Sequence, residues 1–400
     1  MCPRFESRWY HSQKGRFGDL FSLHLCTVHF RTRAMPRTSL RDALQPLSPS
    51  QVVWVREEKL DAQGVSDVRN VLKTLGIALI DECPLAGGEE VKSLETLNLL
   101  WKRWVQAGLR KDGLVLSTGG GALSDVVGLA ASLHQRGVRV AHMPTTTLAM
   151  IDAAWGGKTA VNFDGIKNHL GSFHPPSFVL MDPRWLDTLD ERTRQSGLAE
   201  GVKHFMLSDP AEGAALADLE RAASPPHAWA DDVVEILSHA ARIKMNIVRE
   251  DPLESGLRTV LNLGHTVGHA VESWSHAQGS PWLHGEAVAA GLLFALHEQR
   301  HPGLTTPAGN AIEAPALRPE HEVPEGLVAL LESLAFGKAL PTAAEAWHWM
   351  AHDKKNRANA VRDIAWRGCG SVVWPACWEK QAFEATWRGF LRLPNKSSNR

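Results

Sequence analysis

The stretch LVLSTGGGALSDVVGLAASLHQRG, at residues 114–137, decides the fold class of this 400-residue chain. It opens with an apolar run that ends at Ser117, which is typical of a strand buried on both faces. Consecutive glycines follow, and the apolar residues after Asp125 recur at helical spacing. A strand, a glycine turn and a helix in this order predict one unit of a parallel sheet, with helix amides that suit a pyrophosphate. The Gly-x-Gly-x-x-Ser pattern is weak by itself, so a plain tight turn is nearly as consistent with it as a dinucleotide loop.

The same alternation continues on both sides of this stretch. Strand patterns occur at residues 21–30, 52–55, 77–80 and 138–144. Helical apolar spacing occurs at residues 65–75 and 93–107. Strands that alternate with helices predict an α/β domain with a parallel sheet covered on both faces. The segment IDAAWGGKTAVNFDGIKNHLGSF, residues 151–173, is punctuated by glycines and is predicted to be a loop.

Beyond Glu191 the strand patterns give way to helical ones. The segments GLAEGVKHFML, DDVVEILSHAARIKMNIV and EGLVALLESLAFG all carry apolar residues at helical spacing. We therefore predict an α/β domain at residues 21–190 and an all-α domain at residues 191–400, with a ligand between the two. Periodicity is weak at the N-terminus, so residues 1–20 are predicted to be a disordered extension.

Composition narrows the function classes. The net charge of −1 gives no overall attraction to nucleic acid or to anionic membranes. The five cysteines are scattered and contain no Cys-x-x-Cys, which argues against a disulfide framework and favours a reducing compartment. No apolar run is long enough to span a membrane, and the N-terminus lacks the apolar region of a secretory signal. We expect a cytoplasmic protein without nucleic-acid or membrane partners.

A second stretch, NLGHTVGHAVESWSHAQGSPWLHGEAVAAG at residues 262–291, places four histidines among small and apolar residues. Histidine is the commonest protein ligand of transition metals. His265 and His269 are four apart, so they project from one face of a helix and are candidates for a shared metal site. No Glu follows the first of them, as the metalloprotease signature requires, so from this spacing alone a pair of hydrogen-bonded core histidines is the commoner interpretation and a shared metal site the less common one.

Polar residues also gather around the loop after residue 144. Thr145, Thr146 and Thr147 end a strand, and Asp152, Lys158, Asn162, Lys167 and Asn168 follow on small-residue segments. Such side chains suit sugar hydroxyls and phosphates, although a solvated loop would carry similar residues.

Many short motifs occur in order: GGGALSD, RGV, PTTTL, DAAWGGKTAVN, KN, LAEGVKH, GLRTVLNLGHTVGHA, LHGEAVA and DKK. Together they resemble the 3-dehydroquinate synthase family of sugar phosphate cyclases over nearly the whole chain. The resemblance implies an α/β domain that binds NAD, a helical domain that binds zinc or cobalt, and a homodimer. The implied reaction converts 3-deoxy-D-arabino-heptulosonate 7-phosphate to 3-dehydroquinate and phosphate, by transient oxidation with NAD, phosphate elimination, re-reduction and aldol closure.

Carried over by position, the resemblance implies a metal site of Glu200, His265 and His284. His269 would then face the substrate phosphate and would not be a ligand. A set of two histidines and one carboxylate leaves an open position for substrate oxygens, as a catalytic divalent site needs.

The resemblance also implies the remaining site residues. The substrate residues would be Arg136, Asp152, Lys158, Asn162, Lys203, Lys244, Arg258, Asn262, His269 and one of Lys354 and Lys355. Of these, Lys158, Asn162 and His269 would bind the phosphate, and Lys244 and Arg258 would bind the carboxylate. Arg136 would reach a phosphate across the dimer interface. The cofactor residues would be Glu89, Lys92, Gly121, Ala122, Leu123, Ser124, Asp125, Thr145, Thr146, Lys158, Lys167, Trp185, Leu186, Asp187 and Thr188.

Some positions depart from the family pattern. Val55 and Arg56 stand where a polar pair usually holds the adenosine ribose, which puts those contacts in question. The phosphate loop reads Phe-His-Pro-Pro at residues 173–176, where the family usually has Phe-Tyr-Gln-Pro, and Trp155 stands beside the Gly-Gly-Lys turn.

Three other functions are considered. One is a cyclase that makes a cyclitol, but the chain keeps His269, Lys158, Lys244 and Arg258, which favours a substrate with a carboxylate. Another is a metal- and NAD-dependent polyol dehydrogenase, which would need no phosphate cluster and would release NADH. The last is a catalytically inactive relative kept as a binding or scaffold protein. Every carried-over catalytic position holds the expected residue type, which argues against this function.

Overall fold

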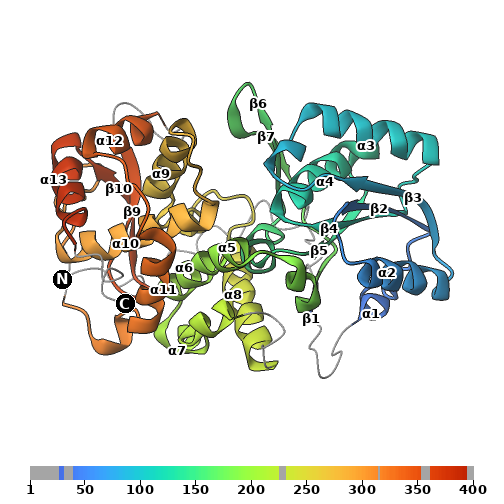
Figure 1. Cartoon of the computed structure of the whole chain (residues 1–400), viewed down its shortest axis with the longest axis horizontal. Helices are drawn as coiled ribbons and strands as arrows, with labels where there is room; N and C mark the ends of the chain where they lie inside the picture. The colour runs from blue at the N-terminus through green and yellow to red at the C-terminus, as the bar shows by residue number, and fades with distance from the viewer. Residues whose placement is uncertain (1–26, 31–38, 225–230, 314–315, 353–360, 394–400) are drawn as a thin grey trace, which may run out of the picture.

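A six-stranded parallel sheet forms the core of the N-terminal lobe in the computed structural model, which describes residues 27–30, 39–224, 231–313, 316–352 and 361–393 (Figure 1). Its strand order is β1-β8-β5-β4-β2-β3, and each registered pair is parallel. The strands are β1 (Thr27–Phe30), β2 (Gln51–Glu57), β3 (Ala78–Leu85), β4 (Leu114–Gly119), β5 (Arg139–Pro144) and β8 (Phe178–Met181). The helices of this lobe are α1 (Leu40–Leu44), α2 (Ala62–Thr74), α3 (Leu94–Ala107) and α4 (Gly121–Leu133). The predicted α/β class is confirmed.

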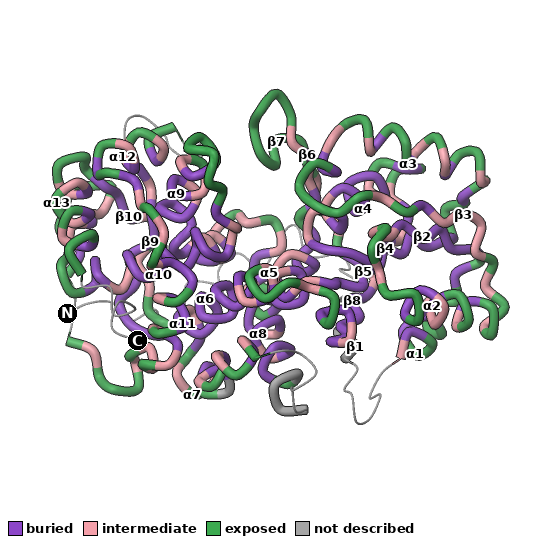
Figure 2. The backbone as a smooth tube through the Cα atoms, in the orientation of Figure 1, coloured by how far each residue is buried: buried purple, intermediate pink, exposed green. Residues whose placement is uncertain are grey.

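The sheet is covered on both faces because its central strands are apolar on both sides. In β2, Val52 and Trp54 join one hydrophobic cluster with α2, whereas Val53 and Val55 join another with α3 and α4. Successive side chains of a strand point to opposite faces, so a continuous apolar run supplies two cores. Figure 2 shows the inner strands as buried. Because the strands are parallel, the turns that follow them meet at one edge of the sheet.

The segment predicted to be a loop at residues 151–173 instead contains an antiparallel hairpin, so that prediction was wrong. Strands β6 (Lys158–Phe163) and β7 (Ile166–Phe173) pair across it. Between them Asp164 and Gly165 both have positive φ, at 50° and 74°. Asp-Gly is the sequence that a tight two-residue hairpin turn prefers. The hairpin projects from the N-terminal lobe toward the space between the lobes, with an exposed outer strand (Figures 1 and 2).

The C-terminal lobe is helical, as predicted. Its helices are α5 (Glu191–Ser196), α6 (Leu198–Leu207), α7 (Pro210–Gly213), α8 (Asp231–Glu250), α9 (His265–Ala277), α10 (His284–Arg300), α11 (Glu325–Ala335), α12 (Ala343–Ala351) and α13 (Lys380–Phe390). It is not all-α, however, because β9 (Val361–Trp366) pairs antiparallel with β10 (Val372–Trp378). This ribbon carries β-branched and aromatic residues that suit a pleated, half-buried surface.

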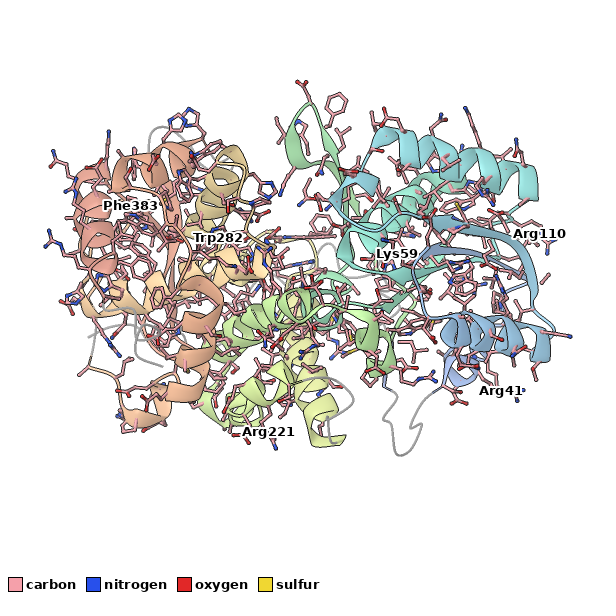
Figure 3. All side chains as sticks on the ribbon, in the orientation of Figure 1. Arg41, Lys59, Arg110, Arg221, Trp282 and Phe383 are labelled. Atoms are coloured by element: carbon pink, nitrogen blue, oxygen red, sulfur yellow. The ribbon has the colours of Figure 1, made fainter. Side chains whose placement is uncertain are left out.

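Aromatic side chains attach this ribbon and α13 to the buried helix α10. The Phe294 ring of α10 lies 5.6 Å from the ring of Trp378, 5.6 Å from that of Phe383 and 5.2 Å from that of Trp387. Phe383, labelled in Figure 3, faces the interior of this lobe. Offset and tilted ring pairs of this kind add roughly 0.5–1.5 kcal/mol each beyond area burial. Trp378 and Trp387 thus pack against α10 through Phe294.

Some predictions lie beyond what the structure describes. The proposed extension at residues 1–20 and the pair Lys354 and Lys355 are outside the described residues, and of the strand predicted at residues 21–30 only Thr27–Phe30 is described. Among the described residues, no helix is both long enough and apolar enough to cross a membrane.

Candidate active site between the lobes

Glu200, His265 and His284 converge from three different helices. Glu200 lies in the first turn of α6, His265 begins α9 and His284 begins α10. The Glu200 Oε1 atom lies 3.4 Å from His265 Nε2 and 3.3 Å from His284 Nε2. One ligand atom from each residue lies within 4.8 Å of the others. The three side chains can therefore reach a common point.

These distances fit a divalent transition metal. Two ligand atoms that are each about 2.1 Å from a tetrahedral ion lie roughly 3.4 Å from one another. Glu200 is fully buried and forms an ion pair with Lys203, and its two oxygens lack hydrogen bonds of regular geometry among the described residues. A buried carboxylate with unused lone pairs is costly, and a second cation at this point would occupy them. The donor set of two imidazoles and one carboxylate is one that zinc accepts.

The two imidazoles are held with Nε2 toward that point. His265 Nδ1 lies 3.1 Å from the Leu263 carbonyl oxygen, which can only accept, so Nδ1 carries the proton. Burial lowers the pKa of His265 to about 3, so its ring is neutral and able to bind a metal. Burial opposes protonation of His284, but hydrogen bonds and charges from Glu200 and Glu272 outweigh it and raise its pKa to about 10. His284 therefore exchanges a proton for the metal when the site is filled.

Glycines on α10 bring the three ligand-bearing segments together. A Cβ at Gly285 would lie 1.8 Å from the Ser196 carbonyl oxygen, just before α6. A Cβ at Gly291 would lie 1.9 Å from the Gly264 carbonyl oxygen, just before His265. Such approaches are possible only without a side chain, so the glycines of HGEAVAAG set the spacing of the metal ligands.

Replacing Gly285 with alanine is expected to lower both stability and metal affinity, because the new methyl would force α10 away from Ser196. Overpacking of this kind costs roughly 1–3 kcal/mol. Thermal unfolding and zinc titration of the metal-free protein measure the two effects. Gly326→Ala is the matched control, since its Cβ would meet only the flexible end of Glu220. Equal behaviour of the two variants would contradict the spacing role of Gly285.

A buried charge cluster lies beside the metal triad. Lys203, on the helix of Glu200, forms an ion pair with that carboxylate and lies 3.5 Å from Asp152. Lys244 Nζ lies 2.9 Å from Asp152 Oδ1, and His204 Nε2 lies 3.3 Å from the same atom. Burial alone would raise the pKa of Asp152, but the two ammonium groups hold it well below its usual range. Burial lowers the pKa of Lys244, which makes the loss of its proton easier than in water.

A second group surrounds Arg258, which is buried on the short segment before α9. Its guanidinium donates to the carbonyl oxygens of Pro252 and Gly156 and lies 5.5 Å from the Phe173 ring centroid. The Nε atom of Arg258 is buried and has no hydrogen-bond partner in the part of the chain that the structure describes, and burial lowers the pKa of the guanidinium. An unsatisfied buried guanidinium nitrogen is a ready partner for an anionic ligand.

Glu254 joins two of the predicted substrate residues. Its carboxylate pairs with Lys158, and its Oε1 atom accepts a hydrogen bond of 3.2 Å from Asn262. Its backbone is left-handed, with φ of 56°, which is uncommon outside glycine and asparagine. His269 lies beside the metal triad, with its ring centroid 5.4 Å from that of His265 and 6.1 Å from that of His284.

Several residues predicted to bind the cofactor form a third group, called the cofactor group here, at the carboxyl edge of the sheet. Lys92 lies 2.6 Å from Asp125 and also contacts Asn168. The Gly120 amide, at the start of α4, donates to Glu57 Oε1 at 2.8 Å. Thr145 is buried beside the glycine turn and bonds through its amide to the Gly119 carbonyl oxygen. The turn is thus bordered by hydroxyl and carboxylate groups.

A cavity of about 260 Å³ lies at the same edge. It is lined by Asp61 and Gly64, at the start of α2, and by Arg184, Trp185, Asp187 and Thr188. Three of these residues belong to the predicted cofactor set. Arg184 pairs with Asp182 at 2.8 Å and with Asp67 at 3.4 Å.

The structure separates some residues that were predicted to act together. Asn162, predicted to share the phosphate with Lys158, donates to Glu89 and lies with the cofactor group. The two positions are four residues apart on one strand, or about 13 Å. Lys167, predicted to hold the cofactor, forms an ion pair of 2.6 Å with Glu272 of α9. Arg136 is exposed at a left-handed turn past the end of α4, away from the glycine turn at its start.

Three carboxylates in these groups were not predicted from the sequence: Glu57, Glu254 and Glu272. Each carried a signal. Glu57 ends a strand directly before a turn, Glu254 lies four residues before Arg258, and Glu272 follows His265 by seven positions on one helix face. A lone glutamate is ordinarily a solvated residue, so these signals are weak before the fold is known.

Comparison with known proteins adds independent findings. A family model described as 3-dehydroquinate synthase N-terminal matches residues 82–196, and one described as 3-dehydroquinate synthase C-terminal matches residues 197–356. The 3-dehydroquinate synthase of Acidithiobacillus ferrooxidans is 37% identical over 335 residues, which cover 82% of this chain and 85% of that protein. That of Geobacter metallireducens is 38% identical over 289 residues, covering 72% of this chain and 75% of that protein.

A solved structure is also similar. It is the 2-epi-5-epi-valiolone synthase ValA from Streptomyces hygroscopicus, with NAD+ and Zn2+ bound. The TM-score is 0.75 at 26% identity, covering 92% of this chain and 97% of that chain.

Proposed function

The chain belongs to the 3-dehydroquinate synthase family, and we propose that it converts 3-deoxy-D-arabino-heptulosonate 7-phosphate to 3-dehydroquinate and phosphate. This makes it a carbon–oxygen lyase acting on a phosphate, with NAD and one zinc or cobalt ion as cofactors. We place it in the cytoplasm, consistent with the free, buried state of its described cysteines.

The observation that carries the proposal is the gathering of four cationic side chains near the triad. Lys203 and Lys244 surround Asp152, Lys158 pairs with Glu254, and the charge of Arg258 acts on both Lys244 and Glu254. The proposed substrate carries a carboxylate and a phosphate, and each finds charge-assisted donors here. A simple alcohol substrate would use neither.

When bound, NAD would supply a recyclable hydride acceptor, and a metal ion, which Glu200, His265 and His284 would hold, would supply a Lewis acid for the substrate alcohol. The other steps depend on the chain's own side chains. Arg258 and Lys244 hold the carboxylate, while Lys158 and His269 hold the phosphate, so the substrate has one orientation. With that alcohol as a ketone, the neighbouring C–H proton is acidic. An oxygen of the substrate phosphate would take this proton as the C–O bond to the phosphate breaks, so proton and phosphate leave together and a C=C bond forms. Holding the opened chain in register for ring closure is worth several kcal/mol of entropy.

The proposed cofactor position follows the carboxyl edge of the sheet. The pyrophosphate would lie on the glycine turn at the start of α4, where helix amides point outward. The adenosine end would occupy the cavity beside Trp185 and Thr188. Val55 and Arg56 stand where the family usually has a polar pair that holds the ribose. Glu57, the next residue, would accept hydrogen bonds from the ribose hydroxyls in place of that pair. The nicotinamide end would then face the metal.

Phosphate release from the heptulosonate phosphate with catalytic NAD tests this function. We expect many phosphates per NAD and no net NADH. Net NADH from simple alcohols would favour a polyol dehydrogenase instead. Faster turnover of sedoheptulose 7-phosphate, which lacks the carboxylate, would favour a cyclitol-forming cyclase, the kind of enzyme that the similar Streptomyces structure represents.

Arg258→Ala is expected to raise KM for the heptulosonate phosphate by roughly 10- to 100-fold, since a charge-assisted contact is worth about 1.5–3 kcal/mol. NAD affinity should stay near that of the unmodified protein, because Arg258 contacts the Gly156 turn and not the cofactor group. Steady-state kinetics and NAD titration measure the two quantities. Equal loss of both would show general misfolding and contradict the assignment.

We also propose that the chain acts as a homodimer in which Arg136 serves the partner's site. Arg136 follows α4, whose 13 residues span about 20 Å from the glycine turn. Its own site is therefore at the other end of this helix. Mixing Arg136→Ala with His265→Ala subunits is expected to restore up to about a quarter of normal activity, because half of the random dimers contain one intact site. No recovery after subunit exchange would contradict the shared site.

A further inference from the structure

Glu272 connects the metal triad to the β6–β7 hairpin of the other lobe. It lies on α9, on the same face of the helix as His265 and His269. Its side chain is only 12% exposed. Its Oε2 atom lies 3.2 Å from His284 Nδ1, and its Oε1 atom lies 2.6 Å from the Lys167 ammonium. One carboxylate thus has two different partners.

The contact with His284 has the geometry of an outer-shell metal interaction. A carboxylate can only accept, so the hydrogen bond places the proton on Nδ1 and leaves Nε2 toward Glu200, 3.3 Å away. A carboxylate behind a metal-binding imidazole fixes the ring and raises its basicity. The Nδ1 atom of His265 instead contacts the neutral carbonyl of Leu263, so of the two groups that orient the imidazoles only Glu272 is charged.

The contact with Lys167 holds the hairpin. Lys167 lies next to the Asp164–Gly165 turn, and its neighbour Asn168 contacts Lys92 of the cofactor group. Consecutive residues of β7 therefore attach one to the helical lobe and one to the α/β lobe.

We propose that Glu272 is a positioning residue with two functions: it orients His284 for the metal, and it fixes the β6–β7 hairpin to the helical lobe through Lys167. The inference rests on the proposed metal site. It makes the metal side and the cofactor side of the site depend on one carboxylate, and neither function requires contact with substrate.

Zinc titration of the metal-free full-length protein tests the first function. Glu272→Ala is expected to weaken zinc binding about 10- to 100-fold, as losses of outer-shell partners do. Glu272→Gln should lose less, because its amide oxygen still accepts from His284. Lys167→Met should leave zinc affinity within a few-fold of the unmodified protein. Glu384→Gln, on α13, is the matched control, since it removes another helical carboxylate that pairs with two cations.

Hydrogen exchange of the hairpin amides tests the second function. Faster exchange at residues 158–173 is expected in Glu272→Ala, Glu272→Gln and Lys167→Met, but not in His284→Ala or Glu384→Gln. Native zinc affinity in Glu272→Ala, with affinity lost in His284→Ala, would overturn the inference and leave the metal site standing. Native zinc affinity in His284→Ala would overturn the metal site and the inference with it. Unchanged hairpin exchange in Lys167→Met would overturn the hairpin function.

Discussion

Replacing His265 with alanine is expected to abolish bound metal and turnover together. His265 supplies one of the three ligand atoms of the group Glu200, His265 and His284 among the described residues, and its ring is neutral and fixed by the Leu263 carbonyl. Losing a direct ligand should cost more than the roughly 10- to 100-fold in metal affinity that follows from loss of an outer-shell partner. Metal analysis of the purified variant and phosphate release from the substrate measure the two losses.

His276→Ala is the control, because His276 lies on the same helix and is exposed. It should keep metal and activity. Full metal occupancy in His265→Ala would mean that the convergence of Glu200, His265 and His284 is an ordinary polar cluster.

The second large effect is expected for Lys203→Met, measured on the metal-free protein. Lys203 is buried between Glu200 and Asp152, and although burial opposes its charge, these two carboxylates raise its pKa. Removing its ammonium leaves the two buried carboxylates with less positive charge to balance them, which typically lowers the free energy of unfolding by about 3–5 kcal/mol. Thermal unfolding should show a fall in Tm of roughly 5–10 °C.

Zinc should partly reverse this loss, because a cation beside Glu200 replaces the missing ammonium. The rise in Tm on adding zinc is therefore expected to be larger for Lys203→Met than for the unmodified protein. Lys380→Met removes an exposed lysine from an ion pair with Glu384 and should change Tm very little. An unchanged Tm in metal-free Lys203→Met would show that Lys203 is not what neutralises the two carboxylates.

Local pattern was sufficient for most of the N-terminal lobe. The run at residues 114–117, the glycine turn and the apolar spacing after Asp125 correspond to β4 and α4. A strand that is buried on both faces is a continuous apolar run without alternating polar residues, so its sequence differs clearly from that of a surface segment. The β6–β7 hairpin was predicted as a loop because glycines punctuate it, although Asp164–Gly165 is a hairpin-turn sequence. The β9–β10 ribbon lies in the part of the chain that was predicted to be all-α.

The sequence by itself determined the order of strands and helices, the residue types at the site and the family to which they are similar. It also made His265 and His269 look like a pair, since four-residue spacing places them on one helix face. Only the tertiary structure decided which atoms meet. Glu200, His265 and His284 lie far apart in the chain, and they converge because glycines of α10 let Ser196 and Gly264 approach its backbone directly. Such contacts depend on helix packing, which no local periodicity encodes.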